Sequence, residues 1–110
     1  MSTLPPTLEL KTMQASADQA CRLMKVLTNP DRLLILCQLT QQEKYVSELQ
    51  DLLGIVQPTL SQQLTVLRKE KLVTTRREGK NIYYRFSSPQ ALAVMEVLYT
   101  QFCKKTKVKK

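Results

Sequence analysis

The hydrophobic period of this chain departs from helical spacing in one segment, and that segment restricts the folds the chain can adopt. Before residue 72, apolar residues recur every three or four positions, which is the spacing of amphipathic helices. Residues 72–86, LVTTRREGKNIYYRF, hold two short β-branched and aromatic runs joined by a polar turn at Gly79, as a β-hairpin does. Helical spacing returns from Pro89 to about Lys104. The sequence therefore predicts a mainly α fold that carries one β-hairpin.

Four helices are expected before the hairpin, and the first spans about residues 8–27. Asn29 is suited to cap the second helix, because its side chain can accept a hydrogen bond from the first turn. That helix begins at Pro30, a residue that fits a helix start, and ends near Thr40. Ser47 is expected to cap the third helix in the same way as Asn29.

The expected order of elements is α-α-α-α-β-β-α. Residues 8–104 are predicted to form one domain, between a flexible arm (residues 1–7) and a basic tail (residues 105–110). At 110 residues the chain can bury only a modest core, so dimerisation would add to its stability.

The third and fourth helices follow each other closely, with Gly54 ending one and Pro58 opening the next. The fourth has a narrow apolar stripe, and small polar residues occupy the opposite arc. Two such helices form a helix-turn-helix, whose second helix presents polar side chains to base edges in the major groove of DNA. The side chains expected to contact DNA there are Gln57, Thr59, Ser61, Gln62, Gln63 and Arg68.

The hairpin is the second expected DNA contact, because the charge of the chain is uneven. Residues 57–110 carry twelve Lys/Arg against three Asp/Glu, whereas residues 1–56 carry five against six. A basic half of this kind is the electrostatic footprint of nucleic-acid binding. The hairpin would lie along the DNA backbone as a wing, contacting it through Arg76, Arg77, Lys80 and Tyr83. An ordinary surface helix and hairpin is the alternative.

The chain contains no histidine, which excludes histidine-based general bases, catalytic triads and zinc sites. It shows no secretory signal and no run of about 18 apolar residues that would cross a bilayer. A cytoplasmic location without a membrane partner is therefore expected, and cysteines there are reduced by default. No enzymatic activity and no cofactor are expected.

Three stretches carry a resemblance to a known family. NPDRLLIL, SELQDLLGIVQPTLSQQLTVLRKEKLV and TRREGKNIYYRFS, all within residues 15–104, resemble the ArsR/SmtB family of winged-helix bacterial repressors. The resemblance implies a winged helix-turn-helix homodimer paired through its first and last helices. It also implies that the dimer binds an inverted-repeat operator in double-stranded DNA and leaves it when an inducer binds.

Both metal sites that are common in that family are absent from this sequence. Where many members have a C-V-C pair this chain has YVSEL, which places Tyr45 and Ser47 at the ligand positions. The last helix has Glu96 but no histidine. No metal site is therefore expected, although a site built from cysteines alone stays open.

Cys37, in the second helix, and Cys103, near the end of the last, are the candidate sensor thiols. Their placement is similar to that in the persulfide-sensing, BigR/SqrR-type branch of the family. The resemblance implies that reactive sulfur species bridge the two thiols, shift the last helix, release DNA and so allow transcription of sulfide-handling genes. Lysines that follow Cys103 favour its thiolate, and apolar neighbours raise the pKa of Cys37. Cys103 is therefore expected to attack and Cys37 to resolve, with Cys21 packed near the dimer interface.

Other interpretations stay open. Both thiols could be ordinary core residues, as free cysteines usually are. The same fold could serve as a general thiol–disulfide oxidant sensor or as a cysteine-based metal sensor. Outside this class, the chain could be a small sulfur-transfer enzyme that uses Cys103, or an interaction module without DNA binding.

Overall fold

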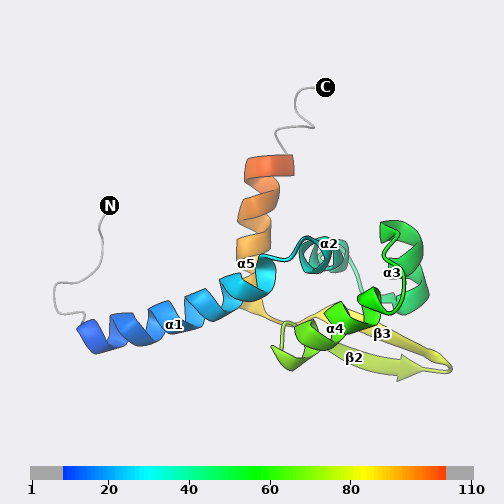
Figure 1. Cartoon of the computed structure of the whole chain (residues 1–110), viewed down its shortest axis with the longest axis horizontal. Coiled ribbons are helices and arrows are strands. Elements are labelled where there is room, and N and C mark those ends of the chain that lie inside the picture. The colour runs from blue at the N-terminus through cyan, green and yellow to red at the C-terminus, as the bar shows by residue number, and fades with distance from the viewer. Residues whose placement is uncertain (1–8, 104–110) are drawn as a thin grey trace.

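Helices make up most of the computed structural model, which describes residues 9–103 (Figure 1). The elements in chain order are α1 (Leu10–Leu27), α2 (Pro30–Leu39), β1 (Lys44–Tyr45), α3 (Val46–Leu53), α4 (Thr59–Lys69), β2 (Val73–Glu78), β3 (Asn81–Phe86), α5 (Pro89–Leu98) and the π-helical turn η1 (Tyr99–Cys103). The predicted winged helix-turn-helix is confirmed, although the sequence does not predict β1. The expected arm and tail lie outside the described residues, as do positions 8 and 104 at the limits of the predicted domain.

The starts of the helices show which side chains satisfy the first backbone donors. The Asn29 side chain accepts from the Arg32 N–H at 3.0 Å, which confirms the predicted cap of α2. The cap expected at Ser47 is wrong, because α3 begins at Val46, two residues before the start that a Ser47 cap implies, and Tyr45 is its N-cap. The carboxylate of Glu48 accepts from the Tyr45 N–H at 3.0 Å, so the helical turn is already closed when the chain reaches Ser47.

α4 ends in a hydrogen-bonded turn of the Schellman type. The Leu72 N–H donates to the Leu67 carbonyl at 2.9 Å, and the Lys71 N–H donates to the Arg68 carbonyl at 3.0 Å. Lys71 has φ +65°, a left-handed conformation that glycine usually adopts at this position. Leu67 and Leu72 both belong to the buried core, and their burial holds the turn that directs the chain into β2.

The three strands form one antiparallel sheet in the order β1-β3-β2. A two-residue turn joins β2 to β3, and its Gly79 has φ +64°, where a side chain would be strained. β1 pairs Lys44 with Tyr84 and Tyr45 with Tyr83. A strand of two residues carries no readable pattern, and β1 forms because the chain between α2 and α3 passes the open edge of β3.

The core lies among α2, α3, α4, α5 and the base of the sheet. Its most completely buried large side chains are Ile35, Leu36, Leu49, Leu60, Leu64, Leu67 and Val73. Burying one leucine of this kind contributes about 1.5–3 kcal/mol of transfer free energy. The apolar stripe predicted for the fourth helix is thus confirmed as its buried face.

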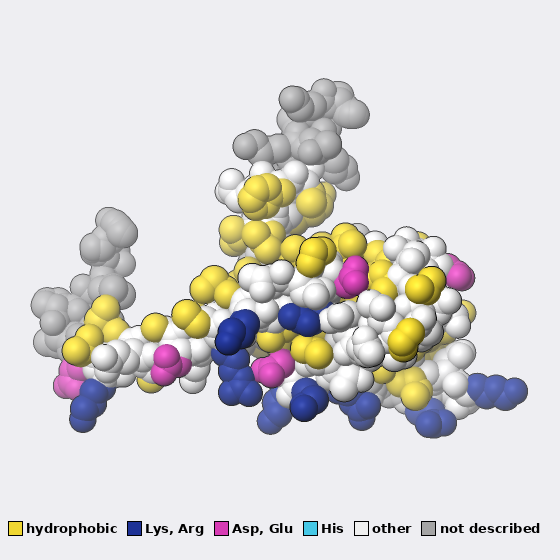
Figure 2. All heavy atoms as spheres, viewed as in Figure 1, with side chains coloured by type: hydrophobic (Ala, Val, Ile, Leu, Met, Phe, Trp, Pro, Cys, Tyr) yellow, Lys and Arg dark blue, Asp and Glu magenta, His cyan; other side chains and the backbone are white. Residues whose placement is uncertain are grey.

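Most of α1 and the outer part of α5 extend away from this core (Figure 1). In α1 only Val26 and Leu27, in its last turn, are buried. Apolar side chains gather along both helices in Figure 2, and Met13, Met24 and Val97 are among the exposed ones. An apolar surface of this kind marks an interaction site. Within residues 9–103, no helix is long and apolar enough to span a membrane.

Candidate functional site

α4 turns a polar arc away from the core. Its three leucines point inward, whereas Ser61, Gln62 and Arg68 are exposed on the other side. Thr59, at the first position of the helix, is half-buried. The helix therefore presents short polar groups in its first turns and a cation in its last turn. Such a face can bring hydrogen-bonding groups to base edges and a charge to the phosphate backbone.

Two glutamines expected to contact DNA have partners within the protein. Gln57 precedes α4, and its Oε1 accepts from the Ser61 N–H at 3.0 Å, which satisfies a backbone donor in the first turn. Gln63 is half-buried, and its Oε1 accepts from Nη1 of Arg32 at 2.9 Å. Gln63 therefore connects α4 to α2 in this structure, and the base contact expected of it stays a prediction.

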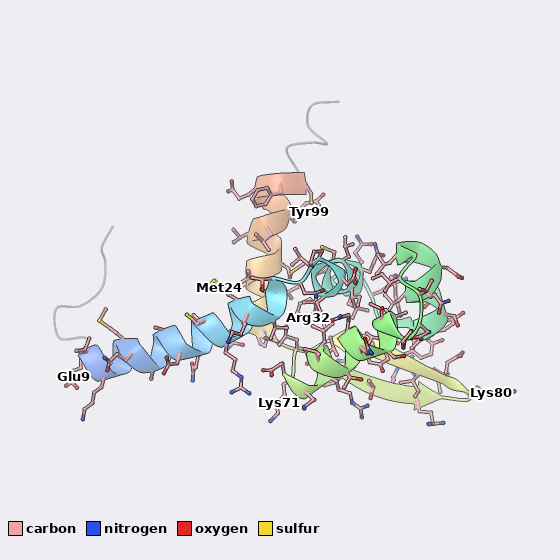
Figure 3. All side chains as sticks on the ribbon, in the orientation of Figure 1. Glu9, Met24, Arg32, Lys71, Lys80 and Tyr99 are labelled. Atoms are coloured by element: carbon pink, nitrogen blue, oxygen red, sulfur yellow. The ribbon has the colours of Figure 1, made fainter. Side chains whose placement is uncertain are left out.

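Arg32 holds α4 against the junction of α1 and α2 (Figure 3). Besides Gln63, its guanidinium donates to the Val26 carbonyl at 2.7 Å and to the Lys25 carbonyl at 3.4 Å. A cation is favourable there because the last carbonyls of α1 carry partial negative charge. Sequence reasoning missed this residue, since nothing local distinguishes such an arginine from a solvated one.

The hairpin presents cations at and near its tip. Lys80 lies in the turn itself (Figure 3), and Arg77 is exposed in β2. Lysine and arginine side chains form a row along one edge of the molecule, over α4 and the hairpin (Figure 2). Lys71 and Lys80 mark the two ends of this basic edge (Figure 3). α4, the recognition helix of the helix-turn-helix, and the hairpin thus place a row of positive charges along one edge, which suits a polyanion.

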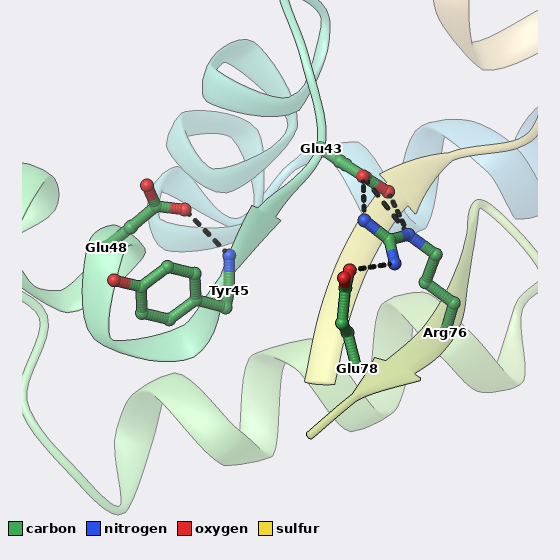
Figure 4. A network of polar contacts seen from close by, with 5 residues as sticks. All are labelled: Glu43, Tyr45, Glu48, Arg76 and Glu78. Carbon is green, nitrogen blue, oxygen red and sulfur yellow. Dashed lines mark hydrogen bonds and ion pairs between the residues drawn. The ribbon is translucent and has the colours of Figure 1, made fainter. Parts of the chain in front are cut away.

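The guanidinium of Arg76 is bound by two carboxylates (Figure 4). Its Nε donates to Oε1 of Glu43 at 3.0 Å, and its Nη1 donates to Oε1 of Glu78 at 2.6 Å. The guanidinium carbon lies 4.6 Å from the centre of the Tyr83 ring, and that ring meets Tyr45 edge-on with centres 5.3 Å apart. Arg76 and Tyr83, both expected to contact DNA, are therefore engaged with neighbours in this structure.

The same contacts shift two ionisation equilibria. The hydrogen bond from Arg76, followed by the positive charges of Arg76 and Arg85, lowers the pKa of the Glu43 carboxyl. Hydrogen bonds to Glu43 and Glu78 raise the pKa of Arg76 above its ordinary range. Sequence reasoning missed Glu43, whose only signal is that it is the one acidic residue in the loop QQEK.

Cys37 and Cys103 line the same groove, which has a volume of about 580 Å³ and lies between α2 and the α5–η1 helix. Both side chains are exposed, so the alternative that these thiols belong to the core is wrong. The wall between them includes Thr40, Leu92, Met95, Glu96, Tyr99 and Thr100. An open groove of this size with a thiol at each side admits a small reagent.

The pKa of the Cys37 thiol lies above its ordinary value, as the sequence predicts. Partial burial is the larger cause, and the negative charge of Cys103 adds to it. The lysines expected to favour the Cys103 thiolate lie outside the described residues.

Cys21 is exposed on α1 and does not line this groove. Within the described part of the chain, no group of three or more His, Cys, Asp or Glu side chains is placed to hold a metal ion.

Comparison with known proteins gives consistent matches. The family model described as "Bacterial regulatory protein, arsR family" matches residues 29–75. The biofilm growth-associated repressor of Agrobacterium fabrum is 47% identical over 94 residues, which cover 86% of this chain and 80% of that protein. The crystal structure of the transcriptional repressor BigR from Xylella fastidiosa has a TM-score of 0.80 at 43% identity, covering 87% and 98%. Reduced HlyU from Vibrio cholerae N16961 has a TM-score of 0.82 at 38% identity, covering 86% and 99%.

These similarities extend over the helix-turn-helix, the wing and the flanking helices together, since they cover nearly the whole chain. With the fold and the relatives in agreement, this chain belongs to the arsR family of bacterial regulatory proteins.

Proposed function

We propose that this protein is a homodimeric, cytoplasmic transcriptional repressor whose DNA affinity is set by the sulfur chemistry of Cys37 and Cys103. In the reduced state it binds an inverted-repeat operator. When reactive sulfur species bridge the two thiols it leaves the DNA, and sulfide-handling genes are transcribed. The observation that carries this proposal is that both thiols line one open groove between α2 and the α5–η1 helix.

The DNA-binding part of the proposal is supported by the recognition helix and the wing. Ser61, Gln62 and Arg68 are exposed on one arc of α4, and Arg77 and Lys80 are exposed on the hairpin. We assign base contacts to the first turns of α4, with Thr59 and Gln57 at its start, and phosphate contacts to the three cations. The basic edge in Figure 2 joins the two surfaces.

The dimer is supported by the exposed apolar side chains on α1 and α5. A second copy would cover them, and the two-fold axis would set the two recognition helices against half-sites about one helical turn apart, ~10 bp or a multiple of it. Bridging Cys37 to Cys103 would pull the α5–η1 helix toward α2. Because that helix lies in the dimer interface in this proposal, the spacing of the recognition helices would change.

The proposed reaction balances in two steps. The Cys103 thiolate attacks the outer sulfur of an organic persulfide, R–S–SH, which forms a Cys103 persulfide and releases the thiol R–SH. The Cys37 thiolate then attacks the inner sulfur of that persulfide, and a disulfide forms with loss of hydrogen sulfide. Two thiols are oxidised and one sulfane sulfur is reduced to sulfide. Attack by Cys103 first is supported by the raised pKa of Cys37, which keeps Cys37 protonated near neutral pH.

The proposal is tested on the reduced protein with glutathione persulfide and, in parallel, with hydrogen peroxide. Intact-mass measurement and peptide mapping identify any Cys37–Cys103 bridge and count its sulfur atoms. A fluorescently labelled duplex, selected from a random pool by the reduced protein, reports DNA binding. We expect persulfide to form the bridge and to release the duplex.

Serine variants provide the controls. Cys37→Ser and Cys103→Ser should bind the duplex as the parent does but keep it after persulfide treatment, while Cys21→Ser should respond like the parent. Release from the Cys103→Ser protein would contradict the pair mechanism. Formation of the same disulfide and equal release of the duplex with hydrogen peroxide would instead identify a general oxidant sensor.

A further inference from the structure

One side chain from each of the three strands forms a row across the sheet. Tyr45 of β1, Tyr83 of β3 and Arg76 of β2 are in register, because Tyr45 pairs with Tyr83 and Tyr83 pairs with Arg76. The rings of the two tyrosines meet edge to face, and the guanidinium lies over the Tyr83 ring. Glu43, which directly precedes β1, reaches across this row and binds Arg76. The contact therefore connects the loop after α2 to the far strand of the wing.

We propose that Glu43 is a positioning residue for DNA binding, which fixes the wing by holding Arg76. The inference rests on the proposed function, since the orientation of the wing matters only if the wing contacts DNA. Arg76 then serves as the anchor of the hairpin, and Arg77 and Lys80, which are exposed beside it, make the phosphate contacts.

Two carboxylates bind the Arg76 guanidinium, but only one of them can fix the wing to another part of the molecule. Glu78 lies in β2 itself, two residues from Arg76, so its contact is internal to the hairpin. Glu43 is 33 residues away in sequence and belongs to the segment between α2 and β1. Its side chain is also less exposed than that of Glu78, at 31% against 66%.

Backbone hydrogen bonds alone do not connect the loop after α2 to β2. β1 is two residues long and pairs with β3, while β2 lies on the other side of β3. At the other end of the loop, the Cys37 carbonyl accepts from the hydroxyl of Thr40 at 2.7 Å, which anchors the loop to the last turn of α2. The side chain of Glu43 thus links the loop anchored on α2 to β2, across β3.

A surface ion pair of this kind adds little to global stability, because both side chains still contact solvent, at 43% and 31% exposure. The expected effect of removing it is therefore on the orientation and mobility of the hairpin. This expectation separates a positioning role from a merely structural one, which would lower the unfolding temperature.

The test compares Glu43→Gln with Glu78→Gln. Each substitution replaces one of the two carboxylates that bind the Arg76 guanidinium with a neutral amide. Each therefore removes one negative charge and changes the long-range attraction to DNA in the same direction. Amide hydrogen exchange of residues 73–86 is measured in the free, reduced proteins. Dissociation constants are measured for a duplex that the reduced wild-type protein has selected from a random pool, at several salt concentrations.

We expect Glu43→Gln to speed exchange in the hairpin and to weaken binding of the duplex by roughly tenfold, within the range that single coupling residues produce. Glu78→Gln should leave exchange in β3 unchanged and bind DNA equally or more tightly, since it makes the surface near the DNA backbone more positive. The unfolding temperatures of both variants should match the parent.

Equal changes in the two variants would overturn the proposal, because charge alone would then explain them, and so would the absence of any change in Glu43→Gln. A double variant gives a second test: in an Arg76→Gln background, Glu43→Gln should have no further effect. Additive losses in that double variant would overturn the proposal. If the wild-type protein selects no duplex, the DNA-binding function fails, whereas faster exchange in Glu43→Gln alone would still support the connection between the loop and the wing.

Discussion

The environment of a single side chain decides how Cys37 can react. The thiol is exposed, yet surrounding protein and the nearby Cys103 raise its pKa. A thiol that is mostly protonated near neutral pH is a slow nucleophile toward a free reagent. In the proposed mechanism it resolves a persulfide on Cys103, since both cysteines line one groove. Apolar neighbours in the sequence predict the direction of this shift, but only the fold brings Cys103 to the same groove.

Lys71 gives a prediction at the same scale, about the stability of the fold. Its φ of +65° costs free energy for any residue with a Cβ, and glycine avoids that cost. Lys71→Gly should therefore raise the free energy of unfolding by about 0.5–1 kcal/mol, after the greater entropy of glycine in the unfolded chain is subtracted. Thermal unfolding followed by circular dichroism, at one fixed protein concentration, measures the change.

Lys71→Ala is the matched control, because alanine removes the lysine side chain and its charge but keeps the Cβ. It should leave the unfolding temperature where it is or lower it. A gain as large as that of glycine would show that the charge of Lys71, rather than its backbone conformation, destabilises the protein.

At the scale of the element, α4 separates two adjacent glutamines into different roles. Gln62 is exposed on the polar arc, whereas Gln63 is bound by Arg32. Gln62→Ala should weaken binding to the selected duplex by about 1–3 kcal/mol, as expected for one lost base contact, with little change on random DNA or in thermal stability. Gln63→Ala should instead lower stability by about 1 kcal/mol, because Arg32 loses a partner.

Fluorescence anisotropy with selected and random duplexes, together with thermal unfolding, distinguishes the two variants. An equal loss of affinity on both duplexes would remove Gln62 from base recognition. A Gln63→Ala protein as stable as the parent would show that the hydrogen bond to Arg32 does not fix α4.

The elements differ in how far the sequence predicts them. The stripe of α4 is readable because a surface helix must place apolar residues every three or four positions. The start of α3 is not, since Ser47 and the capping carboxylate of Glu48 compete and the outcome depends on backbone geometry. The final helix is predicted as one segment to Lys104, but α5 ends at Leu98 and the π-helical turn that carries Cys103 follows.

At the scale of the whole molecule, the exposed apolar faces of α1 and α5 predict that two copies of the chain pair as a dimer. Val97→Glu places a charge on the apolar surface of α5 and should convert the dimer to monomers. The free-energy cost of burying an unpaired carboxylate in the interface exceeds the free energy that burial of the apolar surface contributes to association. Sedimentation equilibrium measures the mass, and the variant should also lose affinity for the selected duplex because the two half-sites are no longer bound together.

Leu52→Glu is the matched control for this experiment. Leu52 lies on α3 and is 58% exposed, the same fraction as Val97, but it is not on the helices that carry the proposed interface. Its glutamate variant should remain dimeric. A Val97→Glu protein that keeps the mass of a dimer would place the interface elsewhere.

The sequence by itself determined the order of the helices and the hairpin, the buried stripe of the recognition helix, the turn at Gly79 and the basic second half of the chain. These depend on local spacing, on turn chemistry and on charge, which a linear pattern carries. Tertiary structure alone decided that Gln63 faces Arg32, that β1 joins the sheet and that Glu43 holds Arg76. Each of these depends on which distant segments meet in space, and residues 31 or 33 positions apart leave no local signal of their contact.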